Sequence, residues 1–224
     1  MADAIGQVLV FGLGVGLSPI PIIAVVLMLG TPRARVNGPA FVLGWIVGLA
    51  LVGTIILVVA GGAGATEGAQ PATWVSVLLL VLGALLVLVA VRQLRGRPRR
   101  GQEAAMPSWM RTIDHFTPVR SAAIAFALSA LNPKNLLLTI GAGAAIAQTG
   151  ADPAQEAVAL AVFVLIGTLG TAVPVALYVA LGDRATRPLD ELKTWMAANN
   201  AAIMAVLCLV IGAKLIGDGI TGLG

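Results

Sequence analysis

The chain consists of long apolar runs separated by short polar links. Six runs are long enough to cross a hydrocarbon core of about 30 Å, which takes about 20 helical residues. We place them near residues 4–29, 39–61, 72–92, 119–147, 154–181 and 197–220. The pattern predicts an all-α integral membrane protein with six transmembrane helices. Residues 1–224 then form a single transmembrane domain, with nothing left for a separate catalytic domain.

Composition supports this class and excludes others. The 224 residues are 58% hydrophobic and only 11% charged, whereas soluble domains carry about 25% charged residues. The mean hydropathy is +0.98. A single cysteine excludes disulfide frameworks and cysteine-rich metal sites. No catalytic set of side chains lies at membrane depth, so we expect no enzyme activity, no cofactor and no metal.

Positive charge alternates between the links. Most of the 14 basic residues lie on the first, third and fifth links or beside them, and none lies on the second or fourth: Arg33, Arg35, Arg92, Arg95, Arg97, Arg99, Arg100, Arg111, Arg120, Arg184, Arg187 and Lys193. The positive-inside rule therefore places these three links in the cytoplasm and both termini outside the plasma membrane. Because these basic residues set the membrane orientation and contact anionic lipid headgroups, the net charge of +4 does not indicate a nucleic-acid partner.

Two similar proline motifs divide the chain into halves. Leu17 to Pro21 reads Leu-Ser-Pro-Ile-Pro, and Leu131 to Asn135 reads Leu-Asn-Pro-Lys-Asn. Each motif lies in the first helix of a three-span half, about 1–92 and about 119–220, joined by a basic link at about 93–118. Three is odd, so the halves have opposite orientations. Paired proline-interrupted spans in inverted repeats indicate the central site of a transporter.

Each motif also predicts a broken helix. Proline ends or kinks a helix and suits the first turn of a new one, and Ser and Asn are favoured caps before it. Ser18-Pro19 and Asn132-Pro133 are thus expected to begin half-helices whose N-termini converge on one region and favour an anion. The alternative is a pair of simple proline kinks repaired by neighbouring side chains.

Lys134 is the most informative charge in the chain. It lies about 14 residues, or about 20 Å, from either end of its span, which is too far for its side chain to reach the interface. A charge there costs about 3 kcal/mol, and all ten carboxylates lie in links or near span ends. A substrate carboxylate, phosphate or sulfate would supply the counter-charge. A structural role, capping carbonyls freed by Pro21 or Pro133, is the alternative.

The predicted substrate-binding set combines the lysine with both motifs. It comprises Lys134, Asn132, Pro133, Asn135, Ser18, Pro19 and Pro21.

Three further patterns have less specific interpretations. Apolar stripes in two links indicate amphipathic interfacial anchors, with a gate or docking role as the alternative. Glycines in the second and fifth spans indicate close helix packing, with pathway lining as the alternative. Lys214 and Asp218, four residues apart, indicate a surface pair. The stripes are Met106, Trp109, Met110 and Ile113, and Leu189, Leu192, Trp195 and Met196; the glycines include Gly44, Gly48, Gly167 and Gly170.

The stretch Ala130 to Leu138, Ala-Leu-Asn-Pro-Lys-Asn-Leu-Leu-Leu, resembles the hallmark of the glycopeptidolipid-addressing protein (GAP) family. That family is a branch of the lysine-exporter (LysE) superfamily and includes sulfolipid-addressing proteins. The likeness continues through Pro107-Ser108-Trp109, Trp195-Met196, Asn199-Asn200 and the segment 211–215. It implies a six-helix inverted-repeat membrane protein that helps deliver a lipid or glycolipid to the cell surface. Pro19-Ile20-Pro21 stands where amino-acid exporters usually have Pro-Gly-Pro, which disfavours an amino-acid substrate.

Three functions are consistent with these observations. The first is an exporter that moves an anionic lipid or glycolipid, or its headgroup, with Lys134 binding the anion. The second is an accessory subunit of a larger lipid transporter that acts through the basic link around Arg95–Arg120. The third is a small-solute exporter for an amino acid or other anion. The expected partners are the anionic lipid or glycolipid and membrane lipids; a larger lipid transporter and a homo-oligomer remain open.

Overall fold

The computed structural model describes residues 2–62, 64, 66–67, 70–96, 110, 113 and 115–223. Over these residues the regular structure is helical, apart from one antiparallel pair of two-residue strands in which Thr66 pairs with Pro71. The elements are α1 (Ala2–Gly16), α2 (Pro19–Leu29), α3 (Ala34–Gly62), β1 (Thr66–Glu67), β2 (Gln70–Pro71), α4 (Thr73–Arg95), α5 (Pro118–Ala130), α6 (Pro133–Ala147), α7 (Pro153–Leu181), the 3₁₀ turn η2 (Gly182–Ala185) and α8 (Thr186–Thr221).

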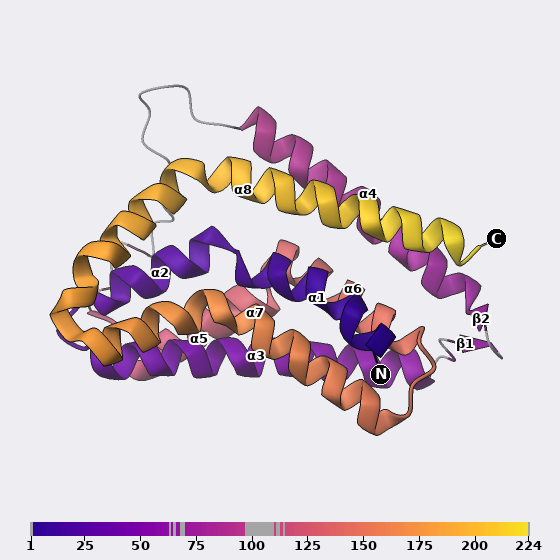
Figure 1. The fold of residues 1–224 in the computed structure, drawn as a ribbon, viewed down its shortest axis with the longest axis horizontal. Coiled ribbons are helices and arrows are strands. Elements are labelled where there is room, and N and C mark those ends of the chain that lie inside the picture. Colours follow the sequence, from indigo (N-terminus) through magenta and orange to yellow (C-terminus); the bar gives the residue numbers. More distant parts are fainter. Residues whose placement is uncertain are drawn as a thin grey trace.

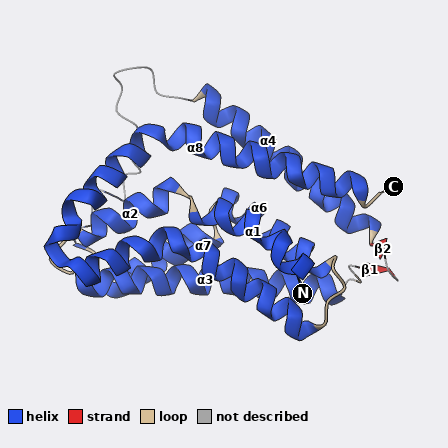
Figure 2. Cartoon of the chain, in the orientation of Figure 1, coloured by secondary structure: helices blue, strands red, loops and turns tan. Residues whose placement is uncertain are grey.

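The helices run along one common long axis (Figure 1). The α2–α3 connection and the α7–α8 turn lie at one end, on the left of the view. The β1–β2 hairpin, the α6–α7 connection and both chain ends lie toward the other end. Figure 2 shows that helix makes up nearly all of the described part of the chain. The described connections therefore alternate between the two ends of the molecule, with α2–α3 and α7–α8 at one end and β1–β2 and α6–α7 toward the other.

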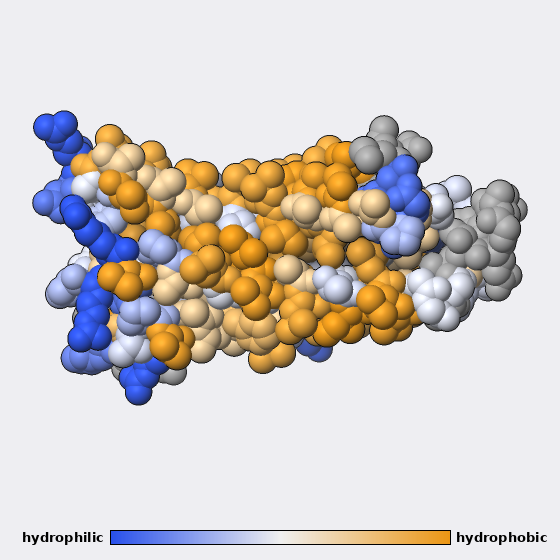
Figure 3. All heavy atoms as spheres, turned by 90° about the horizontal axis from the view of Figure 1, so that it is seen from below, coloured by the Kyte–Doolittle hydropathy of each residue, from blue (hydrophilic) through white to orange (hydrophobic). Residues whose placement is uncertain are grey.

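Within the described residues, three helical stretches are long and apolar enough to cross a membrane: Ala34–Gly62, Thr73–Arg95 and Pro153–Thr221. Two bent helix pairs raise the number of candidates to five if each pair is one span: α1 with α2, bent by 53°, and α5 with α6, bent by 62°. Figure 3 shows that apolar residues cover most of the middle of this face of the molecule and that hydrophilic residues gather at the left end. The prediction of an all-helical membrane protein is confirmed.

Small residues allow the helices to pack closely. Helix α4 lies along α8, α3 along α5, and α1 along α7. A Cβ at Gly44 would lie 2.1 Å from the carbonyl oxygen of Ala122 on α5, and one at Gly170 would lie 1.8 Å from that of Gly16 on α1. Neither position can hold a side chain unless the helices separate. The packing interpretation of these glycines is thus confirmed.

The two apolar stripes differ from the expected interfacial anchors. Met110 and Ile113 are buried in the hydrophobic core, next to Phe116, whose carbonyl accepts a hydrogen bond of 3.0 Å from Asn37 Nδ2 on α3. For these two residues the anchor prediction is wrong, because their apolar face packs on the bundle. Met106, Trp109 and four link arginines, Arg97, Arg99, Arg100 and Arg111, lie outside the described residues.

The second stripe belongs to the last helix. Helix α8 begins at Thr186, well before the predicted start near 197. No glycine or proline interrupts residues 189–197, and exposed Arg187 and Glu191 form an ion pair of 3.0 Å one turn apart, so the helix continues. Leu189 and Met196 are buried, whereas Trp195 is 57% exposed. Only the exposed part of this stripe can contact the membrane–water interface.

Candidate functional site at the two helix breaks

The first break leaves the backbone carbonyl of Gly14 without its helical partner. Helix α1 ends at Gly16, and Ser18 is extended with φ −73° and ψ 112° before Pro19 opens α2. The Ser18 N–H donates to the carbonyl of Val15 at 3.2 Å, instead of to Gly14 four residues back. Pro19, one residue further on, has no N–H. The Gly14 carbonyl must therefore find a donor elsewhere.

The second break repeats this geometry. Asn132 is extended with φ −67° and ψ 122°, and Pro133 opens α6. The Asn132 side chain accepts a hydrogen bond of 3.0 Å from the Lys134 N–H, which makes it a true N-cap. The carbonyl of Leu128, like that of Gly14, lies five residues before the proline. It accepts a hydrogen bond of 2.9 Å from Asn135 Nδ2.

Lys134 connects the two breaks. Its side chain is buried, with the residue only 5% exposed, and Nζ donates to the Gly14 carbonyl at 2.7 Å. Nζ also donates to Ser18 Oγ. Ser18 Oγ lies 2.6 Å from the Val15 carbonyl and 3.1 Å from Asn135 Oδ1, so its single proton serves one of these two acceptors. The first turns of both half-helices thus meet at this lysine.

Dipoles rather than a carboxylate surround the ammonium group. Among the described residues the ion pairs all join neighbours on α8: Arg187 with Glu191, Lys193 with Asp190, and Lys214 with Asp218. The partners of Lys134 in this part of the chain are a carbonyl and a hydroxyl group. An ammonium group carries three donors, and these two contacts satisfy two of them. The site can therefore attract an anion without breaking an internal ion pair.

The predicted site residues differ in what they contact at the two breaks. Lys134, Ser18 and Asn135 are in mutual contact, and Asn132 caps α6. Pro19 and Pro21 are buried, whereas Pro133 is exposed at the surface of the second break. The prediction that Ser18 caps its helix is wrong: its side chain makes no capping bond, because the hydroxyl turns toward Val15, Lys134 and Asn135.

The whole of this arrangement lies within one family match. The chain matches the family described as Sap, sulfolipid-1-addressing protein, over residues 8–221. It belongs to this family. The resemblance to sulfolipid-addressing proteins is thereby confirmed, and the sulfolipid-1-addressing match contains both helix breaks and Lys134. No curated protein and no solved structure matches the chain.

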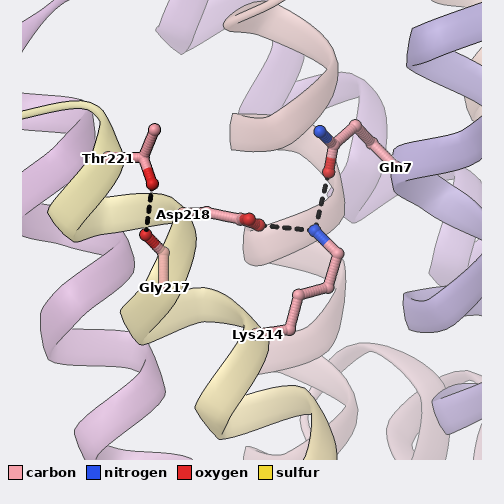
Figure 4. Close-up of polar contacts among 5 residues, drawn as sticks. All are labelled: Gln7, Lys214, Gly217, Asp218 and Thr221. Carbon is pink, nitrogen blue, oxygen red and sulfur yellow. Dashed lines mark hydrogen bonds and ion pairs between the residues drawn. The ribbon is translucent and has the colours of Figure 1, made fainter.

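A second lysine in this member of the family joins α8 to α1 (Figure 4). Lys214 Nζ donates to Gln7 Oε1 at 2.7 Å and to Asp218 Oδ2 at 2.5 Å, and it lies 5.5 Å from the centre of the Phe11 ring. The predicted pair of Lys214 and Asp218 is present and both side chains are partly exposed, but Lys214 also contacts Gln7 and Phe11 on α1, which was not predicted from the sequence. The available signal was Gln7, the only amide in the apolar run 5–16.

Proposed function

We propose that this protein is an exporter that moves an anionic lipid or glycolipid, or its headgroup, across the plasma membrane toward the cell surface. The observation that carries the proposal is the buried ammonium group of Lys134, held by a carbonyl and a hydroxyl group. A charged lysine in the middle of a membrane costs free energy, so its presence there indicates a function. The family description names a sulfolipid, and a sulfate or phosphate ester has the charge that the site lacks.

Six crossings in two inverted halves are part of the proposal. Helices α7 and α8 contain 29 and 36 residues, about 44 and 54 Å at 1.5 Å per residue, so each is long enough to cross alone. The chain turns between them at Gly182, whose φ of +58° suits glycine. The pairing of α1 with α7 and of α5 with α3 also supports two related halves.

Orientation follows from the charges at the two ends. The described arginines near the α2–α3 and α7–α8 connections lie at one end of the molecule (Figure 1), so we place this end in the cytoplasm. Both termini then face outward, and the first half is inverted relative to the second. Membership of the lysine-exporter superfamily would account for this arrangement.

The geometry suggests how binding alters the protein. One N–H donor of Lys134 is open to an anion, and an anion that engages a second donor competes with the Gly14 carbonyl or the Ser18 hydroxyl. Binding of this second kind weakens the support of the first break and changes the stability of the α1–α2 bend. A ligand shifts a conformational equilibrium only through such a difference between states. In this way one residue would bind the headgroup and also bias the shape of the broken helix.

A substitution at Ser18 separates an anion-binding role of Lys134 from a purely structural one. In Ser18→Asp the new carboxylate would lie against the ammonium group, and Asp remains a favoured N-cap. We expect the variant to insert and fold, but to bind a sulfated or phosphorylated lipid at least about tenfold more weakly, since the internal carboxylate competes with the ligand. Ser18→Asn, similar in size and neutral, is the matched control and should bind normally.

The cellular assay compares surface-extractable with total lipid in a strain that lacks the gene. Wild type and Ser18→Asn should restore the surface lipid, Lys134→Arg should restore part of it, and Ser18→Asp and Lys134→Ala should leave lipid inside. Normal surface lipid with well-expressed Ser18→Asp and Lys134→Ala would overturn the binding role of Lys134. An accessory role in a larger lipid transporter would then be the better explanation.

A further inference from the structure

An apolar groove lies beside the first helix break. It has a volume of about 410 Å³ and is formed by α1, α2, α7 and α8. Leu13, Leu17, Ile22, Val173, Leu177 and Trp195 are among its walls, and no lining residue is charged or carries a polar group apart from the Trp195 ring N–H. The volume falls within the range of about 300–1,000 Å³ that is usual for ligand pockets. Its chemistry suits a hydrocarbon chain and offers nothing to a soluble anion.

The groove and the lysine lie on neighbouring faces of one short segment. Leu17 lines the groove, and the next residue, Ser18, contacts Lys134 Nζ. Next to this segment α1 and α7 are in close contact, since a Cβ at Gly170 would lie 1.8 Å from the Gly16 carbonyl oxygen. The groove lining and the contact of Lys134 are thus consecutive residues, Leu17 and Ser18, at the point where the helix is interrupted.

We propose that this groove holds an acyl chain of an anionic lipid while the headgroup binds at Lys134. The inference rests on the proposed function and adds a binding site for the acyl chain to the headgroup site at Lys134. The buried cation lies beside the groove, because its Nζ contacts Ser18 and the preceding residue, Leu17, lines the groove. Another lining residue, Trp195, is largely exposed, and an indole ring is suited to the level of lipid headgroups. A lipid entering from the cytoplasmic leaflet would meet Trp195 first and the break last.

The molecule also contains a control groove. A second apolar groove of about 570 Å³ lies between α3 and α7 and includes Val42, Ile46 and Leu165 in its walls. Ser18, Asn135 and Lys134 line neither groove, but the first groove includes Leu17, the residue before Ser18, whereas the second includes no residue of the helix breaks. Bulk lipid should fill both grooves, but a lipid selected by its headgroup should prefer the groove beside the break. The contrast between the two grooves therefore isolates the specific contribution.

The test uses the protein in nanodiscs of phosphatidylcholine with a trace of lipid carrying a photoactivatable acyl chain. One probe has a phosphatidylglycerol headgroup and the other a phosphatidylcholine headgroup. We expect the anionic probe to label the 13–22 and 173–177 segments several-fold more than the zwitterionic probe. Labelling of segment 42–50 should be equal for both probes, and Lys134→Met should remove the excess. Equal labelling of the two grooves, or an excess that survives Lys134→Met, would overturn the inference.

A blocking variant keeps this test distinct from that of the proposed function. Val173 is 48% exposed and faces the groove, so Val173→Trp should fill it; Leu165→Trp on the same helix fills the control groove. We expect Val173→Trp to lower lipid export at least about tenfold and Leu165→Trp to leave it unchanged. If Val173→Trp exports normally while Ser18→Asp does not, the acyl groove is wrong and the headgroup site stands. If Ser18→Asp exports normally, the proposed function fails, and the groove inference fails with it.

Discussion

The break between α1 and α2 and the break between α5 and α6 have nearly the same shape but different means of support. The bends are 53° and 62°, and each leaves open the carbonyl five residues before its proline. At the second break, Asn132 caps α6 and Asn135 satisfies Leu128, both within one segment. At the first break, no side chain caps α2, and the Gly14 carbonyl depends on Lys134 from the other half of the chain.

This difference means that Lys134 stabilises the fold and also belongs to the candidate binding site. The open carbonyl of the second break, Leu128, is satisfied from its own half, whereas that of the first break, Gly14, is satisfied from the other half. Because the same ammonium group completes the first break and would receive an anion, ligand binding and the geometry of α1–α2 cannot be independent. A residue that only neutralised substrate would leave the fold untouched when it was removed.

The largest effect is expected for Lys134→Met, which keeps the length of the side chain and removes all its donors. The Gly14 carbonyl would be left unpaired in the bundle, at a cost of about 1–3 kcal/mol, and export should be lost. Thermal unfolding in detergent and the surface-lipid assay measure the two effects. Arg187→Met, on the exposed polar turn of α8, is the control. Unchanged thermal stability of Lys134→Met would show that the first break does not need the lysine.

Asn135→Leu tests the second break in the same way. It removes the donor to Leu128, which should destabilise the protein by about 1–3 kcal/mol. Lys134 and its contacts remain, so export should fall but not vanish. The informative quantity is the ratio of export to folded protein, measured for both variants. If Asn135→Leu abolishes export at normal stability, Asn135 binds substrate directly and the two breaks differ less than we infer.

Asn132→Ala should have a smaller effect. It removes the capping bond to the Lys134 N–H, which is worth about 1 kcal/mol. The first turn of α6 should loosen, and hydrogen exchange of the residues around 133–136 should increase. Asn132→Ser, which keeps a capping oxygen, should restore most of the protection. Equal exchange in all three proteins would contradict the assignment of Asn132 as a cap.

Ser18→Ala should be the mildest of the four changes in stability. Its side chain makes no capping bond, and Lys134 keeps the Gly14 carbonyl. We expect a loss of about 0.5 kcal/mol, smaller than that of Asn132→Ala although both residues precede a proline. A loss larger than that of Asn132→Ala would mean that the Ser18 hydroxyl, rather than the Gly14 carbonyl, is the principal partner of Lys134.

The helix breaks and the membrane character could be predicted from the sequence because both depend on local rules. Proline has no backbone N–H to donate at any position, and apolar runs can be read directly from the sequence. The partner of Lys134 could not be predicted, since it depends on how α6 packs against α1. Sequence reasoning foresaw a capping role but assigned it to carbonyls freed by Pro21 or Pro133; Asn135 fulfils that role at Pro133, and Lys134 serves Gly14. The contact of Lys214 with Gln7 was missed because it joins opposite ends of the chain.

The unequal breaks also bear on how such a protein could be assembled from duplicated parts. Aligned on the prolines, the first half carries Ile20 and Pro21 where the second carries Lys134 and Asn135. A dimer of two first halves would have no side-chain donor for either open carbonyl. A dimer of two second halves would bring two ammonium groups face to face in the membrane, where their repulsion is scarcely screened. Only unlike halves give two satisfied breaks and one charge, so the asymmetry is a condition of a stable pair.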